Sequence, residues 1–389
     1  MKNCAIIAEY NPLHLGHIKQ ISYVKEVLGA QNVIVIMSGN FTQRGEPSVM
    51  NKYKRAKHAI LAGADMVIEL PTVFATANAE IFAKGAIKIL TALKNINGIC
   101  FGVESGEKED YIALAHAMNN ESKEYKKLLK QKLETGVSLA KAKYLALKEL
   151  NGDYNEELIN SPNNVLGLEY TKAIIEYNSE IEIFPMKREG YHNDKTYKKG
   201  ITSATSIRNM IKLDKTKKVK SSVPKFVYKD FDVYPFCFEK LYLLKLLTES
   251  AESMAEITDC TEGLENRIKA LIKDNKTLDG LIEKVSTKRY TETRVRRIMT
   301  ANLLGIDISL VKNALSSPLY AKVLAVNCNK KELVSNFAKT SLFPLITRKS
   351  DVKELKSVAL KCLEKDILAN EIFNLAFGEK ENEFFTLFL

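Results

Sequence analysis

The chain contains no tryptophan, and only six of its 389 residues are cysteines. They are scattered, and no two of them form a C-x-x-C pair; they are Cys4, Cys100, Cys237, Cys260, Cys328 and Cys362. Structural zinc sites need closely spaced ligands, so this spacing argues against one. Scattered cysteines also suit a reducing compartment, and we therefore expect a cytoplasmic protein.

Long apolar runs are also missing. No run approaches the roughly 18 residues that a membrane-spanning helix needs, so no membrane association is expected. The short apolar run at the N-terminus is interrupted by Glu9 and is followed by no small-residue cleavage site, which argues against a signal peptide. The P-loop pattern and the G-x-G-x-x-G pattern are both absent, so any nucleotide would have to be held by another motif.

Positive charge is in excess, with a net charge of +11 and a pI of about 9.1. The excess is concentrated in two blocks. Residues 187–225 hold 12 Lys/Arg against 3 Asp/Glu, and residues 267–297 hold 10 against 4. A solvated face and a charged linker would explain either block alone. Two such blocks favour an anionic partner, and nucleic acid in particular.

The first half of the chain alternates strand-like and helix-like segments. Short runs rich in Ile and Val predict strands at 3–9, 32–37, 65–70, 98–103 and 181–185, and helical spacing predicts helices at about 17–29, 51–63, 78–93 and 164–178. This alternation predicts an α/β fold with a Rossmann-like parallel sheet. The charged Lys/Glu/Ala/Leu-rich stretch at 107–150 is predicted to be a helical insertion between the fourth and fifth strands.

The strand signals fade after a charged segment at 212–226 that ends near Pro224. Helical patterns follow at 238–250, 264–275, 291–305 and 352–367. We therefore predict two domains: residues 1–220 with the sheet, and residues 226–389 with a mostly helical fold.

Two histidines lie where the first predicted strand meets its helix, in "NCAIIAEYNPLHLGHIKQ". In the structural interpretation, either His14 or His17 caps the helix and the other packs. A zinc site formed by this pair is also possible in principle, but no third ligand that zinc needs lies nearby. In the functional interpretation Gly16 lets backbone approach a phosphate, helix amides attract it, and the imidazoles donate to the charge that develops at phosphorus.

A second motif, "GITSATSIRNMI" at 200–211, places hydroxyl groups and an arginine at another predicted helix start. Ser203 is in position to cap the helix, Thr205 and Ser206 fall in its first turn, and Arg208 follows in the next turn. Hydroxyls, helix amides and a guanidinium together can hold pyrophosphate. An ordinary capped helix with a surface arginine is the equally weighted alternative.

"HLGH" followed far downstream by "SATSIR" resembles the HxGH and ISSTxIR signatures of the nucleotidylyltransferase superfamily, with Ala204 in place of one signature serine. Longer blocks, among them "AEYNPLHLGH", "MSGNFTQRGEPSVMNKYKRAKHAILAGADMVIELP", "SPNNVLGLEY", "KREGYHND" and "RYTETRVRRI", resemble the tRNA(Met) cytidine acetate ligase family. These blocks occur in that family's order and span nearly the whole chain.

The resemblance implies a two-step reaction in an ATP-binding catalytic domain, 1–220, and a tRNA-binding domain, 226–389. Acetate attacks the α-phosphate of ATP to give acetyl-adenylate and pyrophosphate, and the acetyl group then passes to N4 of the wobble cytidine of elongator tRNA(Met). Magnesium is expected as counter-charge on the phosphates, with no metal ligands on the protein. Two alternatives remain: nucleotidyl transfer to a small phosphorylated metabolite, and RNA binding without catalysis.

The resemblance also implies site residues. Those expected to act in catalysis are His14, His17, Ser203, Thr205 and Arg208. The implied ATP site comprises Ile7, Ala8, Glu9, Tyr10, Asn11, Pro12, Leu13, His14, Leu15, Gly16, His17, Ile18, Lys19, Gln20, Gly102, Asn163 and Arg188. Asn163 is chosen over its neighbour Asn164. His192 is a further candidate beside the site, whereas His58 and His116 lie in helical patterns and are expected to be structural.

Two segments are predicted to contact RNA. In the loop at 38–47, charge favours Arg44 over Glu46 as a contact for anionic substrates, the alternative being a solvated loop. In "STKRYTETRVRRIM" the candidates are Lys288, Arg289, Tyr290, Arg294, Arg296 and Arg297, because arginines can hold phosphates and a tyrosine can stack on a base. The alternative for this second segment is a basic surface helix.

Overall fold

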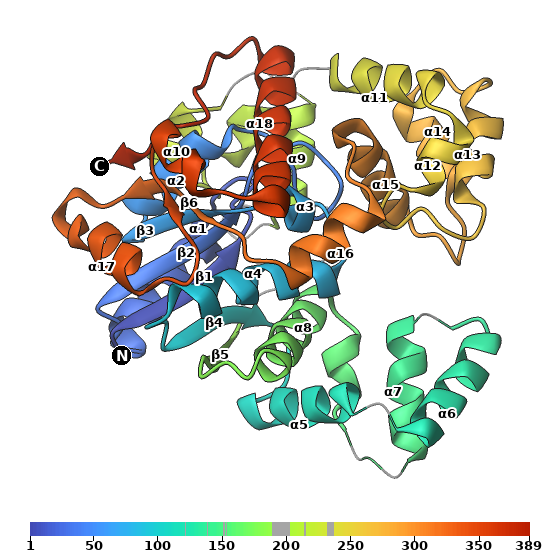
Figure 1. Ribbon diagram of the computed structural model, residues 1–389, viewed down its shortest axis with the longest axis horizontal. Helices are drawn as coiled ribbons and strands as arrows, with labels where there is room; N and C mark the ends of the chain where they lie inside the picture. The colour runs from blue at the N-terminus through green and yellow to red at the C-terminus, as the bar shows by residue number, and fades with distance from the viewer. Residues whose placement is uncertain are drawn as a thin grey trace.

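Five parallel strands form the centre of the molecule in a computed structural model (Figure 1). The structure describes residues 1–120, 122–137, 139–150, 152, 154–188, 203–213, 215–231 and 237–389. The strands are β1 (Asn3–Ala8), β2 (Asn32–Ser38), β3 (Met66–Leu70), β4 (Gly98–Val103) and β5 (Glu182–Lys187), in the order β5-β4-β1-β2-β3. The predicted Rossmann-like parallel sheet is confirmed.

Helices cover both faces of this sheet, which is why its strands read as continuous apolar runs. Every residue of β2 is buried, and its side chains alternate between two cores. Ile34 and Ile36 belong to the core that includes helix α4 (Ala79–Leu93) and helix α8 (Pro162–Glu176). Val33 and Val35 belong to the opposite core, which includes α1 (Leu15–Ser22), its π-helical continuation η1 (Tyr23–Val27) and α2 (Lys52–Leu61).

The segment between β4 and β5 is helical, as predicted. It contains α5 (Lys108–Asn119), α6 (Lys123–Glu134), α7 (Leu139–Glu149) and the short 3-10 turn η2 (Glu156–Ile159), ahead of α8. Figure 1 shows α6 and α7 standing away from the sheet as a pair.

Helices also dominate the part of the chain after β5. The described elements are α9 (Ala204–Lys212), η3 (Thr216–Val219), α10 (Lys225–Lys229), α11 (Cys237–Thr248), α12 (Ala251–Ala255), α13 (Leu264–Ile272), α14 (Leu278–Val285), α15 (Glu292–Leu304), α16 (Ile308–Ser316), η4 (Cys328–Lys330), α17 (Glu332–Thr340), η5 (Lys349–Glu354) and α18 (Ser357–Phe377). The short α3 (Thr72–Ala75) precedes α4 in the first half. The mostly helical character of the second half is confirmed.

The expectation that strands end with β5 is wrong, because the C-terminal part of the chain returns to the sheet. Strand β6 (Ala321–Val326) pairs antiparallel with β3, and β7 (Leu345–Ile346) and β8 (Leu387–Phe388) pair with β6. Every residue of β6 is buried. The run "AKVLAV" therefore belongs to the same sheet as β1–β5, although it lies within the predicted helical domain.

The described residues contain no helix that is both long enough and apolar enough to cross a membrane. All six cysteines are free thiols.

Candidate active site

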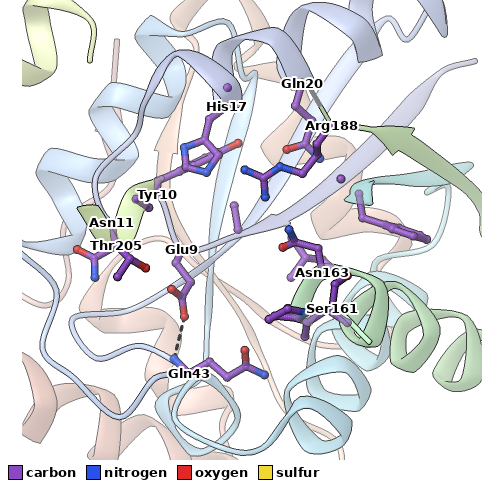
Figure 2. A pocket seen from close by; sticks show the side chains of 18 of the residues that line it. Glu9, Tyr10, Asn11, His17, Gln20, Gln43, Ser161, Asn163, Arg188 and Thr205 are labelled. Carbon is purple, nitrogen blue, oxygen red and sulfur yellow. Dashed lines mark hydrogen bonds between the residues drawn. The ribbon is translucent and has the colours of Figure 1, made fainter. Parts of the chain in front are cut away.

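A cavity of about 780 Å³ opens beside the carboxyl ends of β1, β4 and β5 (Figure 2). Ligands of open α/β sheets bind at this edge of the strands. The walls come from the β1–α1 turn, the loop after β2, the first turns of α4 and α8, the end of β5, α9 and α15. Its volume is near the upper end of the roughly 300–1,000 Å³ typical of ligand pockets, so it has room for a nucleotide and a further group.

The two histidines of the β1–α1 turn hold each other in place through backbone hydrogen bonds. His14 is the N-cap of α1, and its Nδ1 accepts from the Gly16 N–H at 3.1 Å. The Nδ1 of His17 accepts from the His14 N–H at 3.2 Å, and the two rings stack with centroids 3.7 Å apart. Because Nδ1 is the acceptor in both rings, the hydrogen of each neutral imidazole is on Nε2.

The lowered pKa of His17 favours this neutral form. Burial lowers its pKa well below 6.5, and the neighbouring His14 and Arg188 lower it further. The rings of Tyr10 and His17 pack in a T-shaped arrangement, with their centroids 4.9 Å apart. His17 is therefore a rigid, uncharged hydrogen-bond donor on the wall of the cavity. The structural interpretation, in which the histidines cap the helix and pack, also holds. Because the backbone hydrogen bond of His17 uses Nδ1, its Nε2 remains available.

The second motif meets the first through Arg208. This buried guanidinium donates from Nη1 to the backbone oxygen of Asn11 at 2.9 Å and from Nη2 to Thr205 Oγ1 at 3.0 Å. Ser203 caps α9, and its hydroxyl accepts from the Ser206 N–H at 3.2 Å. Thr205 and Arg208 line the cavity, whereas Ser203 does not. The sequence separates these groups from His14 by about 190 residues, and the fold places them along one wall.

The opposite wall is built around Glu104, at the end of β4. Its carboxylate accepts from Ser161 Oγ at 2.5 Å and from Asn163 Nδ2 at 2.6 Å. Burial lowers the pKa of the nearby Arg188, and the Glu104 charge opposes that shift. The stem of Arg188 lies across Gly102, where an added Cβ would be 3.0 Å from Arg188 Cδ. A side chain at position 102 would require the Arg188 stem to shift by a few tenths of an ångström.

The choice of Asn163 over Asn164 agrees with the positions of their side chains. Asn163 lines the cavity. Asn164 is buried, and its amide accepts from the Glu104 N–H at 2.9 Å and donates to Ser105 Oγ at 2.8 Å. Asn164 thus fastens α8 to the end of β4.

The loop at 38–47 is held between α9 and α15 and is mostly buried, so the solvated-loop alternative is wrong. Gly45 has φ +70°, and its Cα faces the backbone of Arg296 and Arg297. The oxygen of Gly45 accepts from Thr300 Oγ1 at 2.8 Å. Glu46 pairs with Lys212 at 2.9 Å, whereas Arg44 lines the cavity.

Comparison with known proteins agrees with this architecture. Residues 1–385 match the HIGH Nucleotidyl Transferase family. The chain is 37% identical over 388 residues to a tRNA(Met) cytidine acetate ligase of Caldanaerobacter subterraneus subsp. tengcongensis, covering 97% of this chain and 96% of the relative. It is 35% identical to the protein of the same name from Clostridium acetobutylicum, covering 96% of each.

The chain belongs to the tRNA(Met) cytidine acetate ligase family.

Solved structures of this family superpose closely on the fold. The crystal structure of apo Thermotoga maritima TmcAL has a TM-score of 0.93 at 27% identity, with full coverage of both chains. The same protein bound with alpha-thio ATP has a TM-score of 0.90.

Most residues of the family's implied ATP site face the cavity. The fourteen that line it are Ile7, Ala8, Glu9, Tyr10, Asn11, His14, Leu15, Gly16, His17, Lys19, Gln20, Gly102, Asn163 and Arg188. Pro12, Leu13 and Ile18 do not line it, and Leu13 is fully buried in the core beside α1. The implied segment is continuous in sequence, but its apolar side chains must also anchor α1. ATP contact by the fourteen remains a prediction.

The implied RNA residues divide into two groups. Arg44 and Arg297 line the cavity, and Arg297 also pairs with Asp259 at 3.0 Å. The others lie outside the cavity. Arg296 pairs with Asp279 at 2.8 Å, Arg294 donates to Thr261 Oγ1 at 2.7 Å, and Arg289 pairs with Glu262. Lys288 and Arg289 remain exposed, beside Tyr290. RNA contact by all of these residues remains a prediction.

His58 and His116 are not part of the cavity lining. His58 is buried in α2 with Nε2 2.9 Å from Asp230 Oδ2, and His116 is exposed on α5. His192 lies outside the described residues.

Several cavity residues were missed by sequence reasoning. Phe82, Phe101 and Tyr170 form apolar lining, and Ser161 and Thr293 add hydroxyls. Each occurs in a helix, at a helix start or in a strand with ordinary core or capping character, so no local pattern separates it from structural residues.

Proposed function

We propose that this protein is an ATP-dependent tRNA ligase that activates acetate as acetyl-adenylate and transfers the acetyl group to N4 of the wobble cytidine of elongator tRNA(Met). The observation that carries the proposal is the wall formed by His14, His17, Thr205 and Arg208 in a family whose Thermotoga maritima relative is solved with alpha-thio ATP. The Nε2–H donor of neutral His17 beside a buried guanidinium suits a polyphosphate.

In the first step a carboxylate oxygen of acetate bonds to the α-phosphorus while the bond to the bridging oxygen of pyrophosphate breaks. No protein nucleophile is required, because the substrate carboxylate is one. The chain supplies position and charge stabilisation: the imidazoles and Arg208 donate to the phosphates, and the amides of α1 add the positive end of the helix dipole.

Magnesium would accompany the phosphates of ATP. The described residues contain no group of three or more His, Cys, Asp or Glu side chains that could hold a metal ion alone. Mg²⁺ commonly keeps several waters and binds through substrate phosphates. Mg²⁺ would there neutralise phosphate charge.

In the second step the acetyl group leaves AMP for the tRNA. The net charge of +11 favours a polyanionic substrate, and exposed Lys288 and Arg289 are available for phosphate contacts.

The test is transfer of labelled acetate to purified, unmodified elongator tRNA(Met), with and without ATP. The variant His17→Asn keeps an acceptor for the His14 N–H but removes Nε2, and we expect label in the tRNA to fall by about 10²–10³-fold. The matched control His116→Asn makes the same change at an exposed position outside the cavity, and it should behave like the wild type. No ATP-dependent label with folded wild-type protein would refute the proposal.

A further inference from the structure

Two polar groups of the cavity lining have no part in the phosphate contacts proposed above. Glu9 follows the last residue of β1, and Tyr170 lies on α8. Both line the cavity. Figure 2 shows the Glu9 side chain pointing away from His17 and toward Gln43, with Arg188 on another side of the cavity. The Glu9 side chain is therefore separate from the phosphate wall.

The orientation of Glu9 is fixed by one hydrogen bond. Its Oε1 accepts from the Gln43 N–H at 2.8 Å, and its backbone oxygen accepts from Arg55 Nη1 at 2.6 Å. Among the described residues no donor engages Oε2. One carboxylate oxygen therefore positions the side chain, and the other remains for a ligand that donates hydrogen.

Tyr170 supplies a hydroxyl group to the same cavity. The residue is only 4% exposed, and its hydroxyl makes no hydrogen bond within the described part of the chain. Burial raises the pKa of this phenol, and the Glu9 carboxylate raises it further. Tyr170 is thus a neutral O–H donor in the cavity that also holds the Glu9 carboxylate.

The surfaces around this pair are flat and apolar. Phe82 and Phe101 are buried and line the cavity, and the rings of Phe101 and Tyr170 meet at 5.8 Å with an interplanar angle of 61°. Leu166 and Ala79 complete the lining there. An unstacked base gains apolar contact in such a site and is read through hydrogen bonds on its edge.

We propose that Glu9 and Tyr170 bind the Watson–Crick edge of the wobble cytosine and that Glu9 accepts the N4 proton during acetyl transfer. Cytosine presents the N4 amine as a donor next to N3 as an acceptor, which matches a carboxylate next to a phenol. This inference rests on the proposed function, because it assigns the base subsite of that reaction.

The transfer step balances with Glu9 as the base. The N4 lone pair forms a bond to the acetyl carbon, and the bond from that carbon to the AMP oxygen breaks, so AMP leaves with the electron pair. The proton lost from N4 passes to Glu9 Oε2. The next acetylation requires only that this proton return to solvent.

The same pair discriminates against uracil. Uracil carries an oxygen at position 4 and a hydrogen on N3, so its acceptor would face the carboxylate. Sites built to hydrogen-bond a substrate amine reject analogues that lack it, because buried polar groups are then left unpaired.

The experiment compares the two half-reactions in Glu9→Gln. Acetate-dependent exchange of labelled pyrophosphate into ATP measures activation, and labelled acetate in tRNA measures transfer. The amide keeps an acceptor for the Gln43 N–H but cannot take a proton, so we expect the ratio of transfer to exchange to fall at least 100-fold. Glu9→Asp should recover part of the ratio. Glu80→Gln, on the same rim but outside the cavity lining, should leave it unchanged.

Base selection gives a second readout. Inhibition of the wild-type reaction by tRNA(Met) carrying U34 should be at least tenfold weaker than inhibition by a C34 competitor. In Glu9→Gln the amide can donate to O4 of uracil, so this difference should shrink toward one. Tyr170→Phe should raise the KM for tRNA more than it changes exchange.

The outcomes separate the inference from the proposed function. No acetate-dependent exchange and no transfer by the wild type would refute the proposed function. If the wild type carries out both reactions, two results would overturn the base subsite alone. One is an unchanged transfer-to-exchange ratio in Glu9→Gln, and the other is equal inhibition of the wild type by U34 and C34 competitors.

Discussion

At the scale of single residues, each imidazole of the H-x-G-H turn uses its Nδ1 for the fold, and both histidines line the cavity. The capping bonds at Nδ1 determine the tautomer, and stacking determines the ring planes. Glu9 divides its two oxygens in the same way between Gln43 and the cavity. Functional groups here are therefore oriented by the same hydrogen bonds that build the turn.

The neutral state of His17 has a consequence for stability. Its folded pKa lies well below 6.5, because of burial, His14 and Arg188. Below about pH 6.5 the unfolded chain binds a proton at this residue and the folded chain does not, so stability falls as the pH falls. Chemical denaturation at pH 7.5 and 5.0 should show a smaller loss in His17→Asn than in the wild type, by about 1 kcal/mol. An equal loss in both proteins would contradict a neutral His17.

At the scale of elements, the loop at 38–47 connects three parts of the site. It contacts α9 through Glu46 and Lys212, α15 through Gly45, and β1 through the bond between Gln43 and Glu9. Its length and composition predicted a loop at a strand end. The burial of that loop depends on α15, about 250 residues later, and no local pattern contains that contact.

A substitution at Gly45 tests how tightly the loop at 38–47 packs against α15. An added Cβ would lie 2.4 Å from backbone atoms of Arg296 and Arg297, and the φ of +70° already disfavours a side chain. Gly29 has a similar φ of +65°, and nothing lies within 4 Å of an added Cβ there. Gly29→Ala therefore measures only the cost of placing a side chain on a left-handed backbone, about 1–2 kcal/mol. We expect Gly45→Ala to lower the unfolding free energy at least twice as much in urea titrations. Equal losses would mean that α15 adjusts freely.

At the scale of the whole molecule, β6 and β8 join the second half of the chain to the sheet of the first half. Four buried charged groups support this junction: Lys52 and Glu69 from the first half, and Lys322 and Glu383 from the second. Burial raises the pKa of Glu69, but the charges of Lys322 and Lys52 outweigh that effect and lower it. The division into residues 1–220 and 226–389 remains a prediction about domains.

Removing one charge from this cluster leaves the others uncompensated. Glu69→Gln would leave buried ammonium groups of Lys52 and Lys322 with less opposite charge, and breaking a buried pair costs about 3–5 kcal/mol. Urea denaturation should show a loss of that order. Glu107→Gln, which breaks an exposed pair with Lys187, should leave the midpoint unchanged. Similar midpoints for both variants would show that the cluster does not stabilise the junction.

The sequence by itself determined the five parallel strands, the helical insertion, the helical second half and the positions of the HLGH and SATSIR motifs at helix starts. These depend on local periodicity and on residues that cap or turn the chain within a few positions. Only the tertiary structure decided that Arg208 reaches Asn11, that Arg297 lines the cavity while Arg294 and Arg296 do not, and that β6 completes the sheet. Those outcomes depend on contacts between residues far apart in the chain, whose free energy arises only when the packed elements exclude water together.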